Sequence, residues 1–218
     1  MIISIHQPEH LPYYGFFNKM RASDAFVVLD DVQYSKNSFQ NRNRIRSKNG
    51  FIWLTVPVLT KGKNKQAISE VIIDNRSNWK NKVLKSIHQN YNKAKYFDGV
   101  YPILETVYNV KYEKLYDLNI GLLHALARYM KITIPIIMSS YFDVPGSSTE
   151  KLVNICKAVS AKTYLSGPGG RDYLDIVKFG DIDVRYADFI HPAYLQQHSP
   201  FIENMSIVDM LMNKGELL

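Results

Sequence analysis

The chain has 218 residues, of which 46% are hydrophobic and 22% charged, and its formal net charge at pH 7 is +7. This length suits one globular domain over residues 1–218 with a large core, and the composition excludes a disordered chain. No apolar run is long enough to span a bilayer, no signal peptide is evident, and Cys156 has no second cysteine to pair with. We therefore expect a cytoplasmic protein without a membrane span.

Two strands near the amino terminus are expected to end in polar side chains. The β-branched run at residues 2–6 indicates a buried strand, a helix is expected from residue 14 to 22, and a second strand at 25–29. In a parallel sheet the carboxyl ends of the strands share one edge, where ligands bind. The residues expected at this edge are His6, Gln7, Asp30, Asp31 and Gln33. The alternative is that His6 and Asp30 only bond turn backbone.

A polar and basic segment follows the second strand. Residues 32–69 contain no acid and eight lysines or arginines. Since Asn, Gln and Arg side chains are costly to bury, residues 34–46 are expected to be exposed loop or ligand contacts, with Arg42, Arg44 and Arg46 on one face. Such a surface favours an anionic small molecule such as a nucleotide sugar. Nucleic acid is a weaker alternative, and a merely solvated face is a third.

The remaining elements alternate between strands and helices. Strands are expected at 53–58, 68–73, 132–138, 163–165 and 183–186, with a basic loop at 61–65. Helical periodicity predicts an insertion of helices at about 78–131, a further helix ending near residue 159 and a closing helix that ends at Gly215. The pattern predicts an α/β fold with a mostly parallel sheet of about five to six strands, flanking helices and a central helical insertion.

A glycine-rich loop at residues 166–172 follows one of these strands. Glycines there would let backbone amides approach an anionic group, to which Gly169, Gly170, Arg171 and Asp172 would contribute. The spacing matches neither a P-loop nor the dinucleotide fingerprint, so a simple turn is the alternative.

Several motifs together resemble the WbqC-like family over essentially the whole chain. They are His6-Gln7-Pro8, residues 29–33, residues 40–44, residues 53–58, residues 164–167 with 170–174, and residues 205–211 with Gly215. His10 stands where the family more often has an aromatic residue, and Phe39 where Trp is common. The resemblance implies a bacterial or archaeal protein encoded among genes for surface polysaccharide, such as the O-antigen of lipopolysaccharide. It also implies a glycine or acyl transferase acting on sugar precursors.

The leading hypothesis is an enzyme that transfers an acyl or aminoacyl group, glycyl for example, to an amino-sugar precursor. His6, oriented by Asp30 or Asp31, would be the general base, a role that suits an imidazole with a pKa near neutrality. Gln7, Gln33 and Asn41 would hold the sugar and Arg42 and Arg44 its diphosphate. The full expected substrate-binding set is Gln7, His10, Gln33, Lys36, Gln40, Asn41, Arg42, Asn43, Arg44, Gly169, Gly170, Arg171 and Asp172.

Two other functions remain open at this point. The spacing from His6 to Gly15 loosely resembles HIGH-type nucleotidyltransferases, which would make the protein an adenylate-forming enzyme that uses ATP. The other alternative is a non-catalytic module that binds nucleic acid or glycan through its bases. As cofactors we consider ATP or an acyl donor, and Mg²⁺ held by Asp30 and Asp31. Zinc is a weaker choice, because His6 and His10 lack a clear third ligand.

Overall fold

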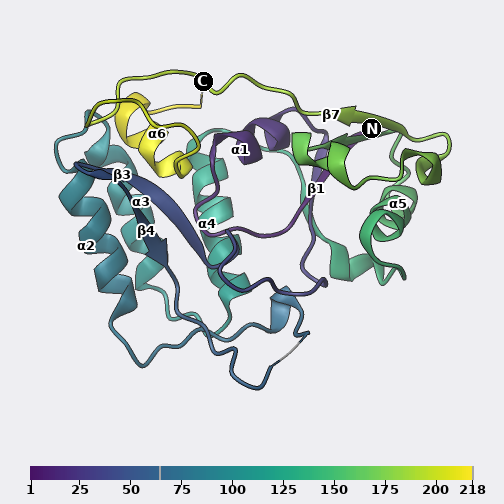
Figure 1. The fold of residues 1–218 in the computed structure, drawn as a ribbon, viewed down its shortest axis with the longest axis horizontal. Coiled ribbons are helices and arrows are strands. Elements are labelled where there is room, and N and C mark those ends of the chain that lie inside the picture. Colours follow the sequence, from purple (N-terminus) through teal and green to yellow (C-terminus); the bar gives the residue numbers. More distant parts are fainter. Residues whose placement is uncertain (64, 218) are drawn as a thin grey trace. The chain divides into compact units, whose positions relative to one another are not determined.

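Five strands form one sheet in the order β5-β2-β1-β6-β7, and every neighbouring pair in it is parallel (Figure 1). The computed structural model describes residues 1–63 and 65–217. The strands are β1 (Ile2–His6), β2 (Ala25–Val28), β5 (Ile136–Met138), β6 (Thr163–Ser166) and β7 (Asp183–Tyr186). The expected α/β class with a parallel sheet is confirmed.

The two faces of this sheet follow from the alternation of side chains along each strand. Ile3 and Ile5 of β1 belong to a buried apolar cluster together with residues of α5 (Ser148–Ala158), such as Leu152 and Ile155. The opposite face lies against α1 (Tyr14–Arg21), where the ring centroids of Phe16 and Phe26 are 5.0 Å apart. Both faces of the sheet are therefore packed against helices, so the accessible polar groups of the strands lie at their ends.

The chain divides into two compact units, each of which is described by itself. Unit 1 contains residues 1–7, 15–31 and 132–190, and it holds the parallel sheet. Three short 3-10 helices also belong to it: η2 (Ser139–Phe142), η3 (Pro168–Asp172) and η4 (Ile176–Phe179). Unit 2 contains residues 8–14, 32–131 and 191–218.

Unit 2 combines a β-hairpin with helices that lie side by side (Figure 1). Its elements are β3 (Arg42–Ser47), β4 (Gly50–Thr55), η1 (Ile68–Glu70), α2 (Trp79–Tyr91), α3 (Phe97–Asn109), α4 (Leu115–Tyr129) and α6 (Ile207–Lys214). Two expected strands differ from the structure. Of the strand expected at 53–58, residues 53–55 belong to β4, which pairs antiparallel with β3 outside the parallel sheet, and residues 56–58 lie beyond its end. Residues 68–70 of the strand expected at 68–73 form the 3-10 helix η1.

A buried carboxylate organises polar groups in unit 2. Asp209 of α6 is 0% exposed, and it accepts hydrogen bonds of 2.6 Å from Tyr91, 2.6 Å from Tyr194 and 2.8 Å from Gln196. Burial raises the pKa of Asp209, and these hydrogen bonds offset part of that increase. These hydrogen bonds connect α2 and α6 with the segment that contains Tyr194 and Gln196. They satisfy the carboxylate oxygens of Asp209, which would be costly to bury without partners.

None of the helices in the described ranges has the length and apolar character needed to cross a membrane. Of the basic loop expected at 61–65, residue 64 lies outside the described residues.

Candidate functional site

The strand order of unit 1 reverses between β1 and β6. From β1 the chain adds β2 and then β5 on one side, and it returns to add β6 and β7 on the other side. In open parallel sheets, the carboxyl edge at such a reversal is the usual position of a ligand site. The residues that leave the sheet at this edge include His6 and Gln7 after β1 and the glycine-rich loop after β6.

Two carboxylates and two serines meet where β2 and β5 end. The Ser139 hydroxyl lies 3.0 Å from Asp30 and 2.6 Å from Asp31, and so bridges the two carboxylates. Asp30 also accepts hydrogen bonds of 3.0 Å from the Ser140 amide and 2.8 Å from the Ser140 hydroxyl. Asp30 and Ser139 are buried, whereas Ser140 is exposed. The arrangement presents one accessible hydroxyl that is hydrogen-bonded to a buried carboxylate.

Lys151 completes this chain of polar groups from α5. Its ammonium group lies 2.6 Å from Asp31 and 2.7 Å from the carbonyl oxygen of Val144. Burial acts to raise the pKa of Asp31, but the hydrogen bonds from Lys151 and Ser139 outweigh it, so the pKa of Asp31 is lowered. Asp31 is therefore ionised at neutral pH.

Sequence reasoning missed Ser139, Ser140 and Lys151. The two serines follow β5 directly, so the rule that identified Asp30 and Asp31 after β2 would have identified them as well. No comparable signal marks Lys151, which lies in the helical stretch beside the apolar Leu152 and Val153.

His6 differs from the expected general base in its titration. Burial, reinforced by the positive charge of Lys19, lowers the pKa of His6 to about 3, and the backbone carbonyl of Gln7 opposes this only in part. The expectation of a pKa near neutrality is therefore wrong for the free protein. Because the Gln7 carbonyl oxygen can only accept, Nδ1 of His6 donates across their 3.0 Å contact, and Nε2 carries the lone pair. A neutral imidazole of this kind is suited to accepting a hydrogen bond from a substrate.

The glycine-rich loop is occupied by contacts within unit 1. A Cβ atom on Gly170 would lie 2.1 Å from the Ser166 hydroxyl, so close packing on β6 requires glycine there, whereas Gly169 faces open space. Both terminal nitrogens of Arg171 bond Asp188, at 2.7 and 2.6 Å, and Asp172 is exposed at the end of η3. This geometry favours a structural role for Gly170 and Arg171 over the expected contact with an anionic donor.

In unit 2, three amides of the expected substrate set are buried by contacts with backbone. Gln40 accepts a hydrogen bond of 2.9 Å from the Ser35 amide, and Asn41 donates one of 3.0 Å to the Val56 carbonyl. Asn43 donates one of 2.8 Å to the carbonyl of Leu11, a residue whose φ of 49° lies in the left-handed region. All three side chains are at most 4% exposed. The expectation that these residues are exposed is thus wrong, whereas their role in ligand binding stays a prediction. The side-chain oxygen of Asn41 is buried and has no hydrogen-bond partner among the described residues.

His10 is buried in the same unit. It is 0% exposed, its Nε2 lies 2.6 Å from the Tyr108 hydroxyl, and burial lowers its pKa to about 3. A substrate cannot reach a side chain in this position without rearrangement of α3. We therefore interpret His10 as a structural residue.

The arginines of the hairpin divide into two groups. The guanidinium groups of Arg42 and Arg44 lie over exposed aromatic rings, at 4.3 Å from the Trp53 ring centroid and 4.9 Å from that of Phe51. Arg46 is 1% exposed, and its guanidinium bonds the backbone carbonyls of Ser47, Gly50 and Pro200. These contacts favour a structural role for Arg46 over the expected ligand contact, whereas the side chains of Arg42 and Arg44 are only partly buried.

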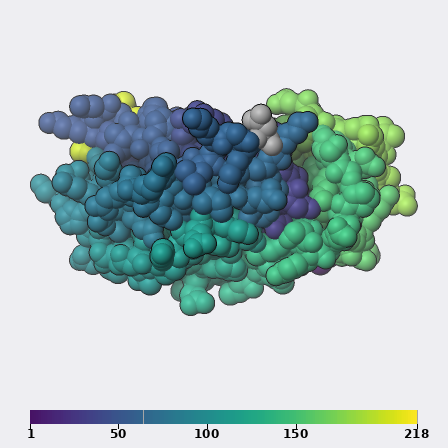
Figure 2. Space-filling model, turned by 90° about the horizontal axis from the view of Figure 1, so that it is seen from below, coloured from purple at the N-terminus to yellow at the C-terminus, as the bar shows by residue number. Residues whose placement is uncertain are grey.

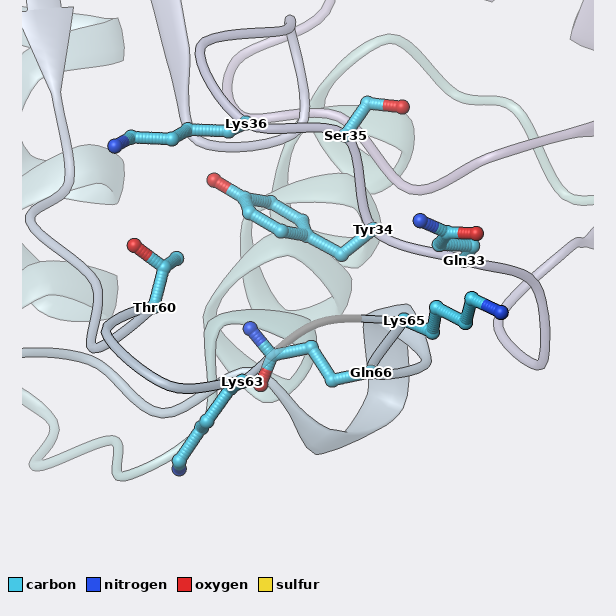
Figure 3. Close-up of a pocket in the computed structure, with 8 residues that line it drawn as sticks. All are labelled: Gln33, Tyr34, Ser35, Lys36, Thr60, Lys63, Lys65 and Gln66. Atoms are coloured by element: carbon cyan, nitrogen blue, oxygen red, sulfur yellow. The ribbon is translucent and has the colours of Figure 1, made fainter.

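A basic pocket in unit 2 contains two more residues of the expected set, Gln33 and Lys36. Its volume is about 730 Å³, and its lining is polar and basic (Figure 3), formed by Gln33, Tyr34, Ser35, Lys36, Thr60, Lys63, Lys65 and Gln66. The blue part of the chain, which includes the segment between β4 and η1, lies at the surface of the face seen in Figure 2.

The expected Mg²⁺ ligands have other partners. Among residues 1–63 and 65–217, no group of three or more His, Cys, Asp or Glu side chains is placed to hold a metal ion. Asp30 and Asp31 bond serine hydroxyls instead, and the Lys151 ammonium supplies positive charge at Asp31.

The sequence comparisons agree with the motifs at these sites. A family model described as the WbqC-like protein family matches residues 7–217. The chain belongs to this family. A protein of Mycobacterium tuberculosis (strain ATCC 25618 / H37Rv), described as uncharacterized, is 33% identical over 217 residues, which cover 98% of this chain and 94% of that protein. No solved structure matches the WbqC-like chain.

The WbqC-like motifs fall on both units. His6-Gln7 and Asp30-Asp31 lie at the sheet edge of unit 1, and residues 40–44 lead into and form part of the hairpin of unit 2. The sheet edge therefore holds the ionisable groups, and the hairpin and the basic pocket hold the accessible positive charge.

Proposed function

We propose that this protein is an acyl or aminoacyl transferase that modifies an amino-sugar precursor of bacterial or archaeal surface polysaccharide. The observation that carries the proposal is the pair formed by the exposed Ser140 hydroxyl and the buried Asp30 carboxylate, 2.8 Å apart at the carboxyl edge of the sheet. Membership of the WbqC-like family supports the polysaccharide setting.

Asp30 is placed to take the proton from Ser140 during attack on an acyl donor. The serine oxygen would form an ester with the acyl group as the donor's leaving group departs, and its proton would pass to Asp30. The amine of the sugar would then attack the ester carbon, and the proton held by Asp30 would pass to the departing serine oxygen. The proton that the nitrogen loses as the amide forms would pass to Asp30 and from there to solvent. A carboxylate that receives its hydrogen bonds from Ser139 and Ser140 is held in one orientation for both steps.

His6 and Lys151 have supporting roles in this scheme. The neutral His6 imidazole would contribute a polar group at the same edge of the sheet. Lys151 fixes Asp31, and Asp31 fixes the Ser139 hydroxyl next to Asp30.

Intact-protein mass spectrometry tests the ester directly. The protein is incubated with acyl-coenzyme A, or with a glycyl thioester, and its mass is measured before and after addition of a nucleotide-linked amino sugar. We expect an added acyl mass that Ser140→Ala abolishes, that Asp30→Asn forms much more slowly, and that the amino sugar removes. Tyr141→Phe, the neighbour of Ser140 with a side chain 79% exposed, is the matched control and should behave like the wild type. An adduct that persists in Ser140→Ala would contradict the proposal.

One observation favours a second candidate, a module that binds glycan or nucleic acid without catalysis. Phe39, Phe51 and Trp53 are 43%, 41% and 41% exposed, and two arginines lie over their rings. Aromatic faces of this kind stack on bases or sugars, and arginines attract phosphate. Binding of oligonucleotides or polysaccharide that is lost in Trp53→Ala, in a protein that forms no acyl ester, would favour this candidate. The adenylate-forming alternative rests only on the spacing from His6 to Gly15, and no contact in the structure adds to it.

A further inference from the structure

The basic pocket of unit 2 is built by two chain segments that pair with each other. The Tyr34 amide donates a hydrogen bond of 2.9 Å to the Gln66 carbonyl, and the Ile68 amide donates one of 2.9 Å to the Val32 carbonyl. An antiparallel bridge between Gln33 and Ala67 lies between these bonds. The pairing fixes the backbone of Tyr34 and Gln66, so the pocket is a built feature rather than a gap between unrelated loops.

The walls of the pocket contain polar groups that lack partners. Tyr34 is 8% exposed, and its hydroxyl has no hydrogen-bond partner among the described residues. The side-chain nitrogen of Gln66 is also buried and without a partner there. In Figure 3 the Tyr34 ring lies in the middle of the group, its hydroxyl is directed toward the side of Lys36 and Thr60, and the Gln66 amide lies below the ring. Buried donors without partners are costly, and a ligand with acceptor atoms would satisfy them.

The charge of the pocket defines the kind of acceptor. Three lysines line the pocket and no acidic residue does. Burial raises the pKa of Tyr34 to about 12, although nearby Arg42 opposes this, so the phenol keeps its proton and donates. Fixed neutral donors with a rim of ammonium groups suit a ligand with several anionic oxygens.

We propose that this pocket binds the diphosphate group of a ligand, with the Tyr34 hydroxyl and the Gln66 amide as hydrogen-bond donors and Lys36, Lys63 and Lys65 as the cationic rim. The volume of about 730 Å³ exceeds what an inorganic ion fills and leaves room for an organic group attached to the diphosphate. The inference rests on the proposed function only for the nature of that group, which would be the amino sugar. Binding of the diphosphate itself requires no transfer reaction.

Isothermal titration calorimetry with inorganic pyrophosphate tests the proposal in the full chain. We expect one binding site, and we expect Tyr34→Phe to weaken binding about tenfold or more, since the hydroxyl donates to a charged group. Lys63→Gln combined with Lys65→Gln should weaken binding further and reduce its dependence on salt. Lys61→Gln, an exposed lysine of the same loop that does not line the pocket, is the matched control and should bind like the wild type.

Several results would overturn the proposal. They are the absence of pyrophosphate binding to the wild type, equal affinity in Tyr34→Phe, and equal affinity for malonate, a dicarboxylate. Loss of binding in the lysine variant alone would show a solvated basic face instead of a built site. Because the Tyr34 hydroxyl has no hydrogen-bond partner among residues 1–63 and 65–217, Tyr34→Phe should keep the wild-type Tm, so weaker binding cannot be assigned to misfolding.

Two further measurements distinguish a free diphosphate from a diphosphate within a larger molecule, and the diphosphate proposal from the acyl-transfer proposal. If uridine diphosphate binds more tightly than pyrophosphate and Tyr34→Phe removes this binding, the ligand is a diphosphate within a larger molecule. Equal affinity for the two would support binding of the diphosphate group alone. Ser140→Ala should bind pyrophosphate normally, because Ser140 belongs to unit 1 and to no wall of this pocket. Failure of the acyl transfer would therefore leave the pyrophosphate result intact.

Discussion

Replacement of Lys151 by methionine tests the polar chain at the sheet edge. The side chains of Lys151 and Asp31 are 10% and 24% exposed, and their charged atoms are 2.6 Å apart. Exposed ion pairs contribute up to about 1 kcal/mol, and breaking a fully buried pair costs roughly 3–5 kcal/mol. Since this pair is intermediate in burial, we expect Lys151→Met to lower the free energy of unfolding of unit 1 by about 2 kcal/mol.

The pH dependence gives this prediction a sign. The pKa of Asp31 is lower in the folded protein than in the unfolded chain, so its ionised form adds stability above about pH 4, and this stability is lost as the pH falls further. Lys151→Met removes the main hydrogen bond that lowers this pKa. The decrease in the free energy of unfolding as the pH falls below about 4, to which protonation of Asp31 contributes, should therefore be smaller in the variant than in the wild type.

The assay has to report on unit 1, because both tryptophans, Trp53 and Trp79, belong to unit 2. Hydrogen–deuterium exchange of peptides from β2 and α5, measured over a series of urea concentrations, gives the free energy of opening of this region. A double-mutant cycle with Asp31→Asn should show a coupling of about 2 kcal/mol. Additive effects, or a Lys151→Met variant within about 0.5 kcal/mol of the wild type, would refute the reasoning.

Two further predictions concern unit 2. Asp209→Asn should lower the stability by about 2 kcal/mol, because the new NH2 group turns a donor either toward the Tyr91 hydroxyl or toward the Tyr194 hydroxyl and the Gln196 amide. Tryptophan fluorescence during urea unfolding measures this change, and a value below about 0.5 kcal/mol would contradict the prediction. The pKa of His10 is about 3 in the folded protein, below its value of about 6.5 in the unfolded chain. Between these two values the unfolded state binds one more proton than the folded state. The free energy of unfolding should therefore fall by up to about 1.4 kcal/mol for each unit by which the pH is lowered from 6.5 to 3. His10→Gln should flatten this part of the profile; an unchanged slope would show that His10 does not cause it.

The fold was predictable because the strands of unit 1 are short apolar runs between turn residues. Ile2–His6 and Ala25–Val28 are buried on both faces of the sheet, and continuous apolar sequence is what such burial requires. The segments at 53–58 and 68–73 were both expected to be strands, yet the first half of one belongs to a hairpin strand and the other begins as a 3-10 helix. Which partner a strand pairs with depends on contacts between distant residues, and local sequence does not record them.

The candidate site was predictable in the same partial way. Polar residues that follow buried strands identified Asp30 and Asp31, and the structure surrounds them with Ser139 and Lys151 from distant parts of the chain. The expected exposure of Asn41 and Asn43 was wrong, since a buried amide nitrogen is tolerated when a backbone carbonyl accepts its hydrogen bond. The sequence shows that these amide side chains are costly to bury, but it does not show which backbone carbonyl accepts their hydrogen bonds.

The proposed transfer depends most directly on the Ser140 hydroxyl. The decisive measurement is the initial rate of acyl or glycyl transfer to a nucleotide-linked amino sugar by the wild type, Ser140→Ala and the control Tyr141→Phe. We expect a rate in Ser140→Ala at least about a hundredfold below that of the wild type, with Tyr141→Phe unchanged. A Ser140→Ala variant that transfers at the wild-type rate would show that the chemistry does not take place at this serine.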